Sequence, residues 1–247
     1  MIVLFTDFGI NGPYIGQLQA AIYQVNPDAK VINLFANAPR FNPVAAGYLL
    51  SAHVRIFPPG TTFLAVVDPG VGSEARRPIV ATIDGKSYVG PDNGLFDALA
   101  IQAQQSDKRE IVWRPDVLSA SFHGRDLFAP IAAHLDRGIL DEDWLGVAED
   151  FDVNGLSEDL DQVIYIDDYG NAMTGIRASQ ISPALSILVN GVTLKHARTF
   201  SDVSKGEAFW YQNSSGLAEI AVNCGSAAEQ LSLRIGTVLR LGSGLLI

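Results

Sequence analysis

The sequence has few of the residues that form disulfides, bind metal ions or bind nucleic acids. Its 247 residues include a single cysteine, Cys224, which excludes an internal disulfide and a multi-cysteine metal site. The four histidines show neither HxH nor HxxxH spacing, so no metal site is predicted. Only 17 lysines and arginines stand against 27 aspartates and glutamates, and the net charge of −10 repels nucleic-acid phosphates. The composition therefore favours a protein without a metal, another cofactor or a nucleic-acid partner.

Long apolar runs and the common catalytic signatures are also missing. No segment approaches the ~20 apolar residues that a membrane-spanning helix needs. The opening run MIVLF lacks a basic flank and is too short for a signal peptide, so the expected location is the cytoplasm without membrane association. The sequence contains no GxSxG elbow, no Walker loop and no GxGxxG fingerprint.

The first part of the chain has the pattern of an α/β domain. Apolar residues make up 48% of the sequence, which is enough for a well-filled core or for apolar subunit interfaces. Predicted helices and strands alternate through residues 1–140. The strands are expected over 2–8, 29–35, 61–68, 77–90 and 109–113, and the helices over 13–25, 43–57, 94–104 and 126–138. Asn42 is a candidate N-cap before Pro43, and Asp84-Gly85 is a hairpin turn inside 77–90.

The pattern changes after about residue 155. Short strands dominate, an Asn190-Gly191 hairpin turn is present, and one short helix is expected over 226–233. We therefore predict an N-terminal α/β domain over 1–140, an acidic linker over 141–160 and a smaller C-terminal β domain over 161–247.

Two aspartates follow predicted strands, where open α/β sheets bind ligands. Asp7 ends the first strand, and its carboxylate could accept two hydrogen bonds from a ribose diol. Asp68 ends the third apolar strand, before a loop with two glycines that lets backbone amides approach a ligand. Arg76 and Arg77 follow, and one of them could pair with Asp68. Turn formation or helix capping explains Asp7 equally well. A turn is also the alternative for Asp68, but two arginines beside its loop favour a site there.

The stretch SFHGRDLF gathers three ionisable groups in front of an apolar helix. Asp126 could place negative charge in the first turn of that helix, and Arg125 could pair with it. His123 has no such local explanation. The stretches YVGPDNG, IDDYGN and YQNSSG are polar too, and turn chemistry explains most of their residues.

Read in order, these motifs resemble one family along nearly the whole chain: TDFG, VVDPGVG, YVGPDNGLF, SFHGRDLFAP, VIYIDDYGN and NSSGLAEIAVNCGSAAE. The family is the adenosine-forming S-adenosyl-L-methionine (SAM) hydrolases, also called SAM hydroxide adenosyltransferases, which are relatives of the fluorinase and chlorinase. The resemblance implies a sandwich-like (Rossmann-like) α/β domain followed by a C-terminal β-barrel. It also implies a homotrimer or a dimer of trimers with sites between subunits. The implied reaction is in-line attack of water on ribose C5′, without a cofactor. A SAM-dependent halogenase and a SAM-binding module without turnover remain the alternatives.

The resemblance also assigns roles to residues. The catalytic set falls on Asp68, Arg76 and His123. The substrate contacts fall on Asp7 for the ribose, Phe41 for an aromatic wall near the sulfonium, Asp167 for the methionine amine, Asn171 for adenine and Ser214 for the methionine carboxylate. The halogenases resemble this chain but carry tyrosine at the place of His123, so the retained Asp68 and His123 favour water as the nucleophile.

Two segments depart from the family pattern. The chain reads NLFANAPRF where many members read DxxHxxPPF, and SEARRP is one residue longer than SERRP. Counted from Asp68, the position of the first arginine falls on Ala75. Counted back from Pro78, which begins the next strand, it falls on Arg76. We adopt the strand as the reference because a loop absorbs an extra residue more easily than a buried strand shifts register. This predicts that Arg76 faces the site and Arg77 faces solvent.

Overall fold

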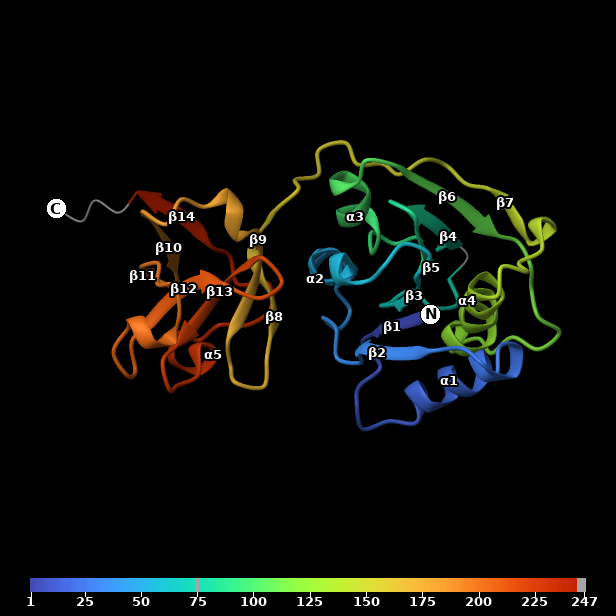
Figure 1. Cartoon of the computed structure of the whole chain (residues 1–247), viewed down its shortest axis with the longest axis horizontal. Coiled ribbons are helices and arrows are strands. Elements are labelled where there is room, and N and C mark those ends of the chain that lie inside the picture. Colours follow the sequence, from blue (N-terminus) through green and yellow to red (C-terminus); the bar gives the residue numbers. More distant parts are fainter. Residues whose placement is uncertain (74–75, 244–247) are drawn as a thin grey trace. The chain divides into compact units, whose positions relative to one another are not determined.

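The computed structural model describes residues 1–73 and 76–243. It divides the chain into two compact units, Met1–Leu156 and Ser157–Ile247 (Figure 1). The first is a mixed α/β unit and the second consists mainly of β-strands, so the predicted fold class is confirmed. Residue Ala75, one of the two alternatives for the arginine position, lies outside the described residues.

Unit 1 is built on one seven-stranded sheet with the order β2-β1-β3-β5-β4-β6-β7. Its strands are β1 (Ile2–Thr6), β2 (Val31–Phe35), β3 (Thr62–Val66), β4 (Pro78–Ile83), β5 (Lys86–Pro91), β6 (Ser106–Ile111) and β7 (Leu145–Val147). The pairings among β2, β1, β3 and β5 are parallel, and those joining β5, β4, β6 and β7 are antiparallel. Because β4 runs opposite to β5, its first residues lie at the same edge of the sheet as the carboxyl ends of the parallel strands.

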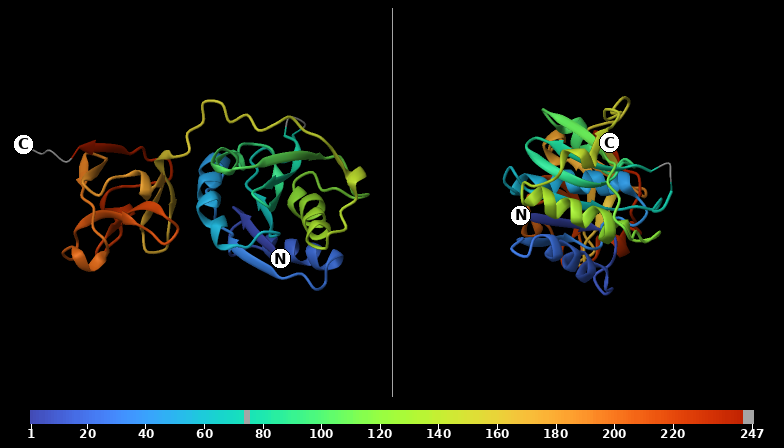
Figure 2. Two further views of the ribbon diagram at one scale, coloured as in Figure 1. Left: turned by 45° about the horizontal axis from the view of Figure 1, so that its top comes forward. Right: turned by 90° about the vertical axis from the view of Figure 1, so that its right-hand side faces the viewer.

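Helices cover both faces of this sheet (Figure 2). They are α1 (Tyr14–Val25), α2 (Pro43–His53), α3 (Asp97–Gln102) and α4 (Ala129–Asp136), with the short η1 (Val54–Ile56), η2 (Gly124–Phe128) and η3 (Glu142–Trp144). On one face α1 packs against α4, and their apolar side chains share a core with β1 and β3. On the other face α2 packs against α3. Strands buried on both sides explain the near-continuous apolar runs of β1 and β3.

Local sequence signals account for several boundaries in unit 1. The side chain of Asn42 accepts a hydrogen bond from the Ala45 N–H at 3.0 Å and caps α2, as predicted. Asp84 and Gly85 form the predicted β4–β5 turn, and both have positive φ angles of 46° and 75°. The acidic segment predicted as a linker carries η3 and β7, and β7 pairs with β6 at the edge of the large sheet.

Unit 2 contains two antiparallel sheets with the orders β12-β13-β9-β8 and β11-β10-β14. Its strands are β8 (Leu160–Ile166), β9 (Ala172–Arg177), β10 (Leu185–Val189), β11 (Val192–Leu194), β12 (Ala208–Gln212), β13 (Leu217–Val222) and β14 (Arg240–Ser243). Its helices are α5 (Ala227–Gln230) and the short η4 (Ala178–Gln180) and η5 (Phe200–Asp202). Side chains from both sheets form one core around Trp210, whose indole N–H donates to the Leu185 carbonyl at 3.2 Å.

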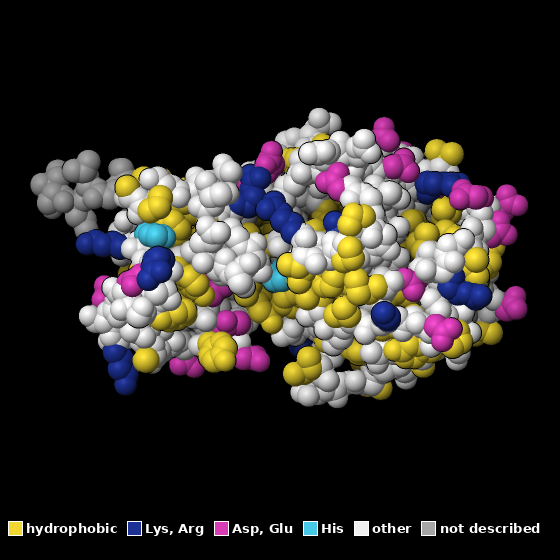
Figure 3. Space-filling view, in the orientation of Figure 1, with side chains coloured by type: hydrophobic (Ala, Val, Ile, Leu, Met, Phe, Trp, Pro, Cys, Tyr) yellow, Lys and Arg dark blue, Asp and Glu magenta, His cyan; other side chains and the backbone are white. Residues whose placement is uncertain are grey.

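Within residues 1–73 and 76–243, no helix combines the length and apolar character needed to cross a bilayer. On the face drawn in Figure 3, lysine and arginine side chains form several small separate groups with acidic side chains among them.

Candidate active site

Two aspartates follow the carboxyl ends of the parallel strands β1 and β3. The strands are paired with Thr6 opposite Val66, and Asp7 and Asp68 follow within two residues. Burial raises the pKa of Asp7, the Phe41 N–H lowers it, and the negative charge of Asp68 adds to the rise. The two carboxylates are therefore close enough to influence each other, as expected for side chains at neighbouring strand ends.

Arg76 lies between Asp68 and His123. Its Nη2 atom is 2.6 Å from Oδ2 of Asp68 and 3.0 Å from Nδ1 of His123. The side chains of Arg76 and Asp68 are only 6% and 4% exposed, so this ion pair is shielded from water. The other Asp68 oxygen accepts the Gly70 N–H at 3.2 Å. The buried Nε of Arg76 has no hydrogen-bond partner among the described residues.

The contact with Arg76 determines which ring nitrogen of His123 carries the hydrogen. A guanidinium only donates hydrogen bonds, so Nδ1 of His123 must accept and the neutral ring carries its hydrogen on Nε2. Burial lowers the pKa of His123, the charge of Arg76 lowers it further, and Asp68 opposes both. At pH 7 His123 is therefore neutral, with its basic nitrogen directed at Arg76.

The neighbouring arginine faces outward. The Arg77 side chain is 52% exposed, and its Nη1 lies 3.6 Å from the Glu110 carboxylate. Strand β4 begins at Pro78, the residue used as the reference for the register. Arg76 thus has the inward and Arg77 the outward orientation that the strand register predicts.

Aromatic packing holds the His123 segment beside the end of β1. A Cβ atom on Gly124 would come within 3.1 Å of the Phe8 ring, so glycine at this position favours the close approach of the two segments. The Phe122 ring packs edge-on against Phe8 and Tyr14, with centroid distances of 5.6 and 5.4 Å. These contacts bring His123 close to the carboxyl ends of β1 and β3, where the two aspartates lie.

The other two charges of SFHGRDLF satisfy each other. The Arg125 guanidinium binds Asp126 through two hydrogen bonds of 2.5 and 3.0 Å, and Asp126 also accepts the Ser119 N–H at 2.9 Å. The pair lies in η2, a single π-helical turn that leads into α4. Arg125 and Asp126 therefore have a local structural role, and of the three ionisable groups only His123 contacts the Asp68–Arg76 pair.

Phe41 contacts Asp7 through its backbone rather than its ring. Its N–H donates to Oδ2 of Asp7 at 3.4 Å, while the side chain is 77% exposed. The residue adopts φ of 58°, which is unfavourable for a side chain with a Cβ. The turn is strained where the chain departs from the family pattern, and it leaves the aromatic ring available to a ligand or a neighbouring molecule.

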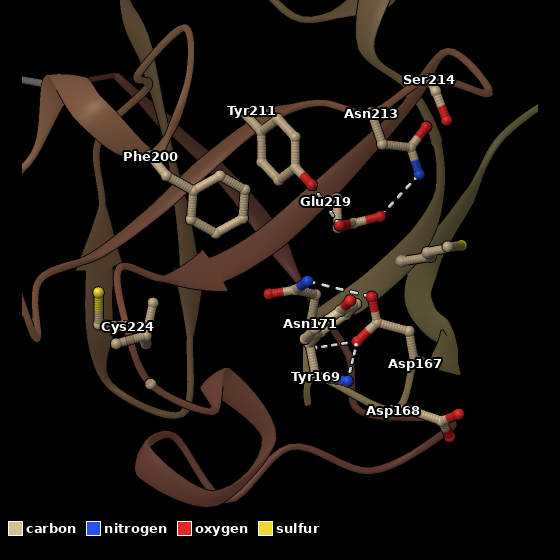
Figure 4. Close-up of a pocket in the computed structure, with 13 residues that line it drawn as sticks. Asp167, Asp168, Tyr169, Asn171, Phe200, Tyr211, Asn213, Ser214, Glu219 and Cys224 are labelled. Atoms are coloured by element: carbon tan, nitrogen blue, oxygen red, sulfur yellow. Dashed lines mark hydrogen bonds between the residues drawn. The ribbon is translucent and has the colours of Figure 1, made fainter.

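The remaining predicted contacts lie in unit 2 and line one cavity of about 920 Å³ (Figure 4). Asp167 and Asn171 occupy the turn between β8 and β9, and Ser214 lies in the turn between β12 and β13. The Asn171 amide donates to Asp167 at 3.0 Å, and the N–H groups of Tyr169 and Asn171 donate to the other Asp167 oxygen. The polar turn thus orders a carboxylate at the cavity wall.

Sequence reasoning missed the buried carboxylate of this cavity. Glu219 lies in the apolar strand β13, is 3% exposed, and accepts hydrogen bonds from Tyr211 at 2.5 Å and Asn213 at 2.7 Å. Burial raises the pKa of Glu219, and the charge of Asp167 adds to the rise. A lone acidic residue inside the run LAEIAV was the available signal.

The cavity is acidic. Its described lining includes Asp167, Asp168 and Glu219 but no lysine, arginine or histidine. Nowhere in the described part of the chain do three or more histidine, cysteine, aspartate or glutamate side chains form a group suited to a metal ion. The polar and charged groups of this cavity therefore fit an organic ligand with positive charge better than an anion.

The predicted residues thus form two groups in the structure. Asp7, Asp68, Arg76 and His123, with the backbone of Phe41, gather in unit 1. Asp167, Asn171 and Ser214 gather in unit 2. One group has a buried ion pair and a neutral histidine, and the other has a large ligand-sized cavity.

An α/β unit with a buried Asp–Arg–His cluster at its sheet edge, joined to a β unit with an acidic cavity, has the composition of a small-molecule enzyme. Family models describe the same two parts. The SAM hydroxide adenosyltransferase N-terminal domain matches residues 2–144, and the corresponding C-terminal domain matches residues 161–240. The chain belongs to the SAM hydroxide adenosyltransferase family.

Known proteins resemble the chain over almost its full length. The (R)-S-adenosyl-L-methionine hydrolase of Thermus thermophilus is 34% identical, with 97% of this chain and 98% of the relative covered. The hydrolase of that name from Salinispora arenicola is 33% identical, with 97% and 96% covered. The crystal structure of an uncharacterized conserved protein from Thermotoga maritima has a TM-score of 0.87 at 32% identity, covering 98% of this chain and 99% of the other.

Proposed function

We propose that this chain hydrolyses SAM to adenosine and L-methionine by in-line attack of water on ribose C5′. The observation that carries the proposal is the buried Asp68–Arg76 pair in contact with His123, in a chain that belongs to this family. Its relatives are named for the (R) epimer at the sulfonium, and we extend that substrate to this chain.

The proposed reaction is balanced without a cofactor. The water oxygen forms a bond to C5′ while the C5′–S bond breaks, and the electron pair of that bond goes to sulfur. The sulfonium becomes the neutral thioether of methionine, so the leaving group needs no acid. One proton of the water is released. Activation of the nucleophile is therefore the only step for which the protein must supply acid–base chemistry.

The geometry of the cluster supports a defined role for each residue in that activation. Water has a pKa of about 15.7 and histidine about 6.5, so complete proton transfer before attack would cost roughly 12 kcal/mol. General-base removal of the proton as the C–O bond forms avoids this cost. Since Nε2 of His123 already carries hydrogen, the water must donate to Nδ1 and displace the Arg76 hydrogen bond there. In this proposal Arg76 donates to the water oxygen, and Asp68 orients Arg76 through their 2.6 Å contact.

The substrate contacts follow the two groups of residues. In unit 1, Asp7 accepts hydrogen bonds from the ribose hydroxyls and the Phe41 ring lies against the sulfonium. In unit 2, Asp167 binds the methionine ammonium, Asn171 contacts adenine and Ser214 contacts the methionine carboxylate. The acidic lining of the unit 2 cavity is consistent with a substrate that carries ammonium and sulfonium charges.

Product analysis tests the function directly. We expect the chain to convert SAM in ¹⁸O-labelled water into methionine and adenosine with the label on the 5′ oxygen. In a mixture of both sulfonium epimers, the (R) form should disappear faster. Chromatography with mass spectrometry, run with and without chloride, checks both points. Unlabelled adenosine or a dominant 5′-halo nucleoside would exclude hydrolysis, and binding without any product would indicate a binding module.

We further propose that the active protein is a homotrimer or a dimer of trimers, in which the unit 1 group of one subunit meets the unit 2 group of a neighbour. Two inactive variants, His123→Asn and Asp167→Ala, should then complement each other. In randomly mixed trimers, about a quarter of the sites combine two intact halves, so about a quarter of parental activity should return on co-expression with two different tags.

Two results would contradict a site shared between subunits. Doubly tagged mixed oligomers without recovered activity would show that the two groups act within one chain. A fully active monomer by light scattering at micromolar concentration would do the same.

A further inference from the structure

Glu219 is a buried carboxylate whose two oxygens are both used inside the unit 2 cavity (Figure 4). It is the direct cross-strand partner of Tyr211 in the β12–β13 pair. The Tyr211 hydroxyl donates to one oxygen at 2.5 Å, and the Asn213 amide donates to the other at 2.7 Å. A carboxylate without a cationic partner is rare in an apolar strand, so a purely structural reason for it is weak.

One hydrogen bond of Glu219 leads to the turn that carries Ser214. The Asn213 side-chain oxygen accepts the N–H groups of Ser215 and Leu217, both at 3.0 Å. These two bonds fix the amide, so that its NH₂ group must point at Glu219. Glu219 thereby holds the whole 213–217 turn in one conformation, and Ser214 lines the cavity from that turn.

The other hydrogen bond leads to the aromatic wall. The Tyr211 ring packs against Phe200 and Phe209, with centroid distances of 5.4 and 5.6 Å. Tyr211 and Phe200 both line the cavity. The hydrogen bond from the hydroxyl fixes the direction of the Tyr211 side chain, and packing against Phe200 and Phe209 restricts the plane of its ring. Together they set the shape of the aromatic surface available to a flat ligand.

We propose that Glu219 is a positioning residue for the substrate, acting through Tyr211 on the aromatic wall and through Asn213 on the Ser214 turn. The inference rests on the proposed function, because it takes SAM as the ligand of this cavity. Glu219 orders two parts of the binding surface at once and takes no part in the chemical step.

Two variants separate hydrogen bonding from charge. Glu219→Ala leaves the Tyr211 and Asn213 donors without an acceptor, and we expect KM for SAM to rise about tenfold or more while kcat stays within about threefold. Glu219→Gln has the same shape. Its carbonyl accepts from Asn213 and its NH₂ donates to the Tyr211 oxygen, which accepts equally well. We therefore expect Glu219→Gln to keep KM within about threefold of the parent.

A matched control lies in the same sheet but outside the cavity lining. Thr174 on β9 is fully buried, and its hydroxyl donates to the Ala218 carbonyl at 2.7 Å. Thr174→Val should lower the melting temperature without changing KM. Should Glu219→Ala fail to fold, Tyr211→Phe removes one of the two hydrogen bonds and should raise KM by a smaller factor.

The results that would contradict the positioning role of Glu219 differ from those that would contradict SAM hydrolysis. A Glu219→Ala enzyme with the parental KM overturns the positioning role while hydrolysis by the parent still stands. A Glu219→Gln enzyme as impaired as Glu219→Ala also overturns it, since charge would then be the requirement. Where the parent binds SAM without turnover, calorimetric Kd replaces KM in the same comparison. A parent that neither binds nor hydrolyses SAM refutes the proposed function itself, and this inference with it.

Discussion

Replacing His123 with asparagine should lower kcat by about two to four orders of magnitude, the usual contribution of a general base. The asparagine oxygen lies near the position of Nδ1 and still accepts the Arg76 hydrogen bond, so the arrangement of Arg76 and Asp68 is retained. The variant loses only the ability to take a proton near neutral pH. Steady-state assays of SAM hydrolysis measure the loss in kcat. KM should change little.

The pH dependence gives this prediction a second readout. A general base acts as the neutral imidazole, and burial together with Arg76 lowers the pKa of His123 from 6.5. Neutral His123 therefore persists below pH 6.5, and kcat/KM should fall only when the pH drops through the lowered pKa. His123→Asn should lose the part of the acidic limb that comes from His123, while any fall caused by protonation of Asp7 and Asp68 remains.

A second histidine of unit 1 serves as the control. Burial also lowers the pKa of His53, whose Nδ1 lies 2.8 Å from the Leu49 carbonyl at the end of α2. His53→Asn keeps a donor for that carbonyl and should keep both the rate and the acidic limb. A His123→Asn enzyme with near-parental kcat would show that His123 is not the general base. The same conclusion would follow if the acidic limb were changed in His53→Asn and not in His123→Asn.

Arg76→Ala should reduce kcat at least tenfold, which corresponds to about 1.4 kcal/mol of barrier. The variant removes the donor aimed at Nδ1 of His123 and the only cation that contacts buried Asp68 among the described residues. Removing one partner of a buried pair typically costs ~3–5 kcal/mol of stability as well. Thermal unfolding and steady-state kinetics on the same preparation measure the two effects separately.

The stability loss of Arg76→Ala should depend on pH with a defined sign. Burial raises the pKa of Asp68, and the charge of Arg76 opposes the rise. Without Arg76 the folded-state pKa rises further above the unfolded value. Folding of the variant is therefore favoured while Asp68 is protonated and loses stability as the pH rises through that pKa. The gap in melting temperature between variant and parent should widen from acidic to neutral pH.

Arg77→Ala is the matched control for Arg76→Ala. The Arg77 side chain is half-exposed and, among the described residues, forms a 3.6 Å surface pair with Glu110, an interaction worth ~0–1 kcal/mol. Its removal should change kcat and stability little. The reverse ranking of the two variants would show that Arg77 serves the site, and equal, negligible effects would show that neither Arg76 nor Arg77 takes part in catalysis.

The sequence by itself determined most of the fold. Apolar runs buried on both faces predict β1 and β3, Asn42 before Pro43 predicts the start of α2, and Asp84-Gly85 predicts the β4–β5 turn. These features depend on residues close together in the chain. Periodicity and turn chemistry therefore suffice to predict them. The same holds for the orientation of Arg76, because the strand that begins at Pro78 sets its register.

Only the tertiary structure decided which groups touch. Asp68 and Arg76 lie near the two ends of the loop between β3 and β4, and His123 lies directly before η2 in a distant part of the chain. The sequence left open whether Asp68 orients the arginine or the histidine. The structure shows Arg76 between them, which also determines the His123 tautomer. The hydrogen bonds of Glu219 were hidden for the same reason, since Tyr211 lies across the β12–β13 pair and Asn213 lies in the turn that joins the two strands. Contacts of this kind depend on how strands and loops pack against each other, and that packing is set by the whole core rather than by any local pattern.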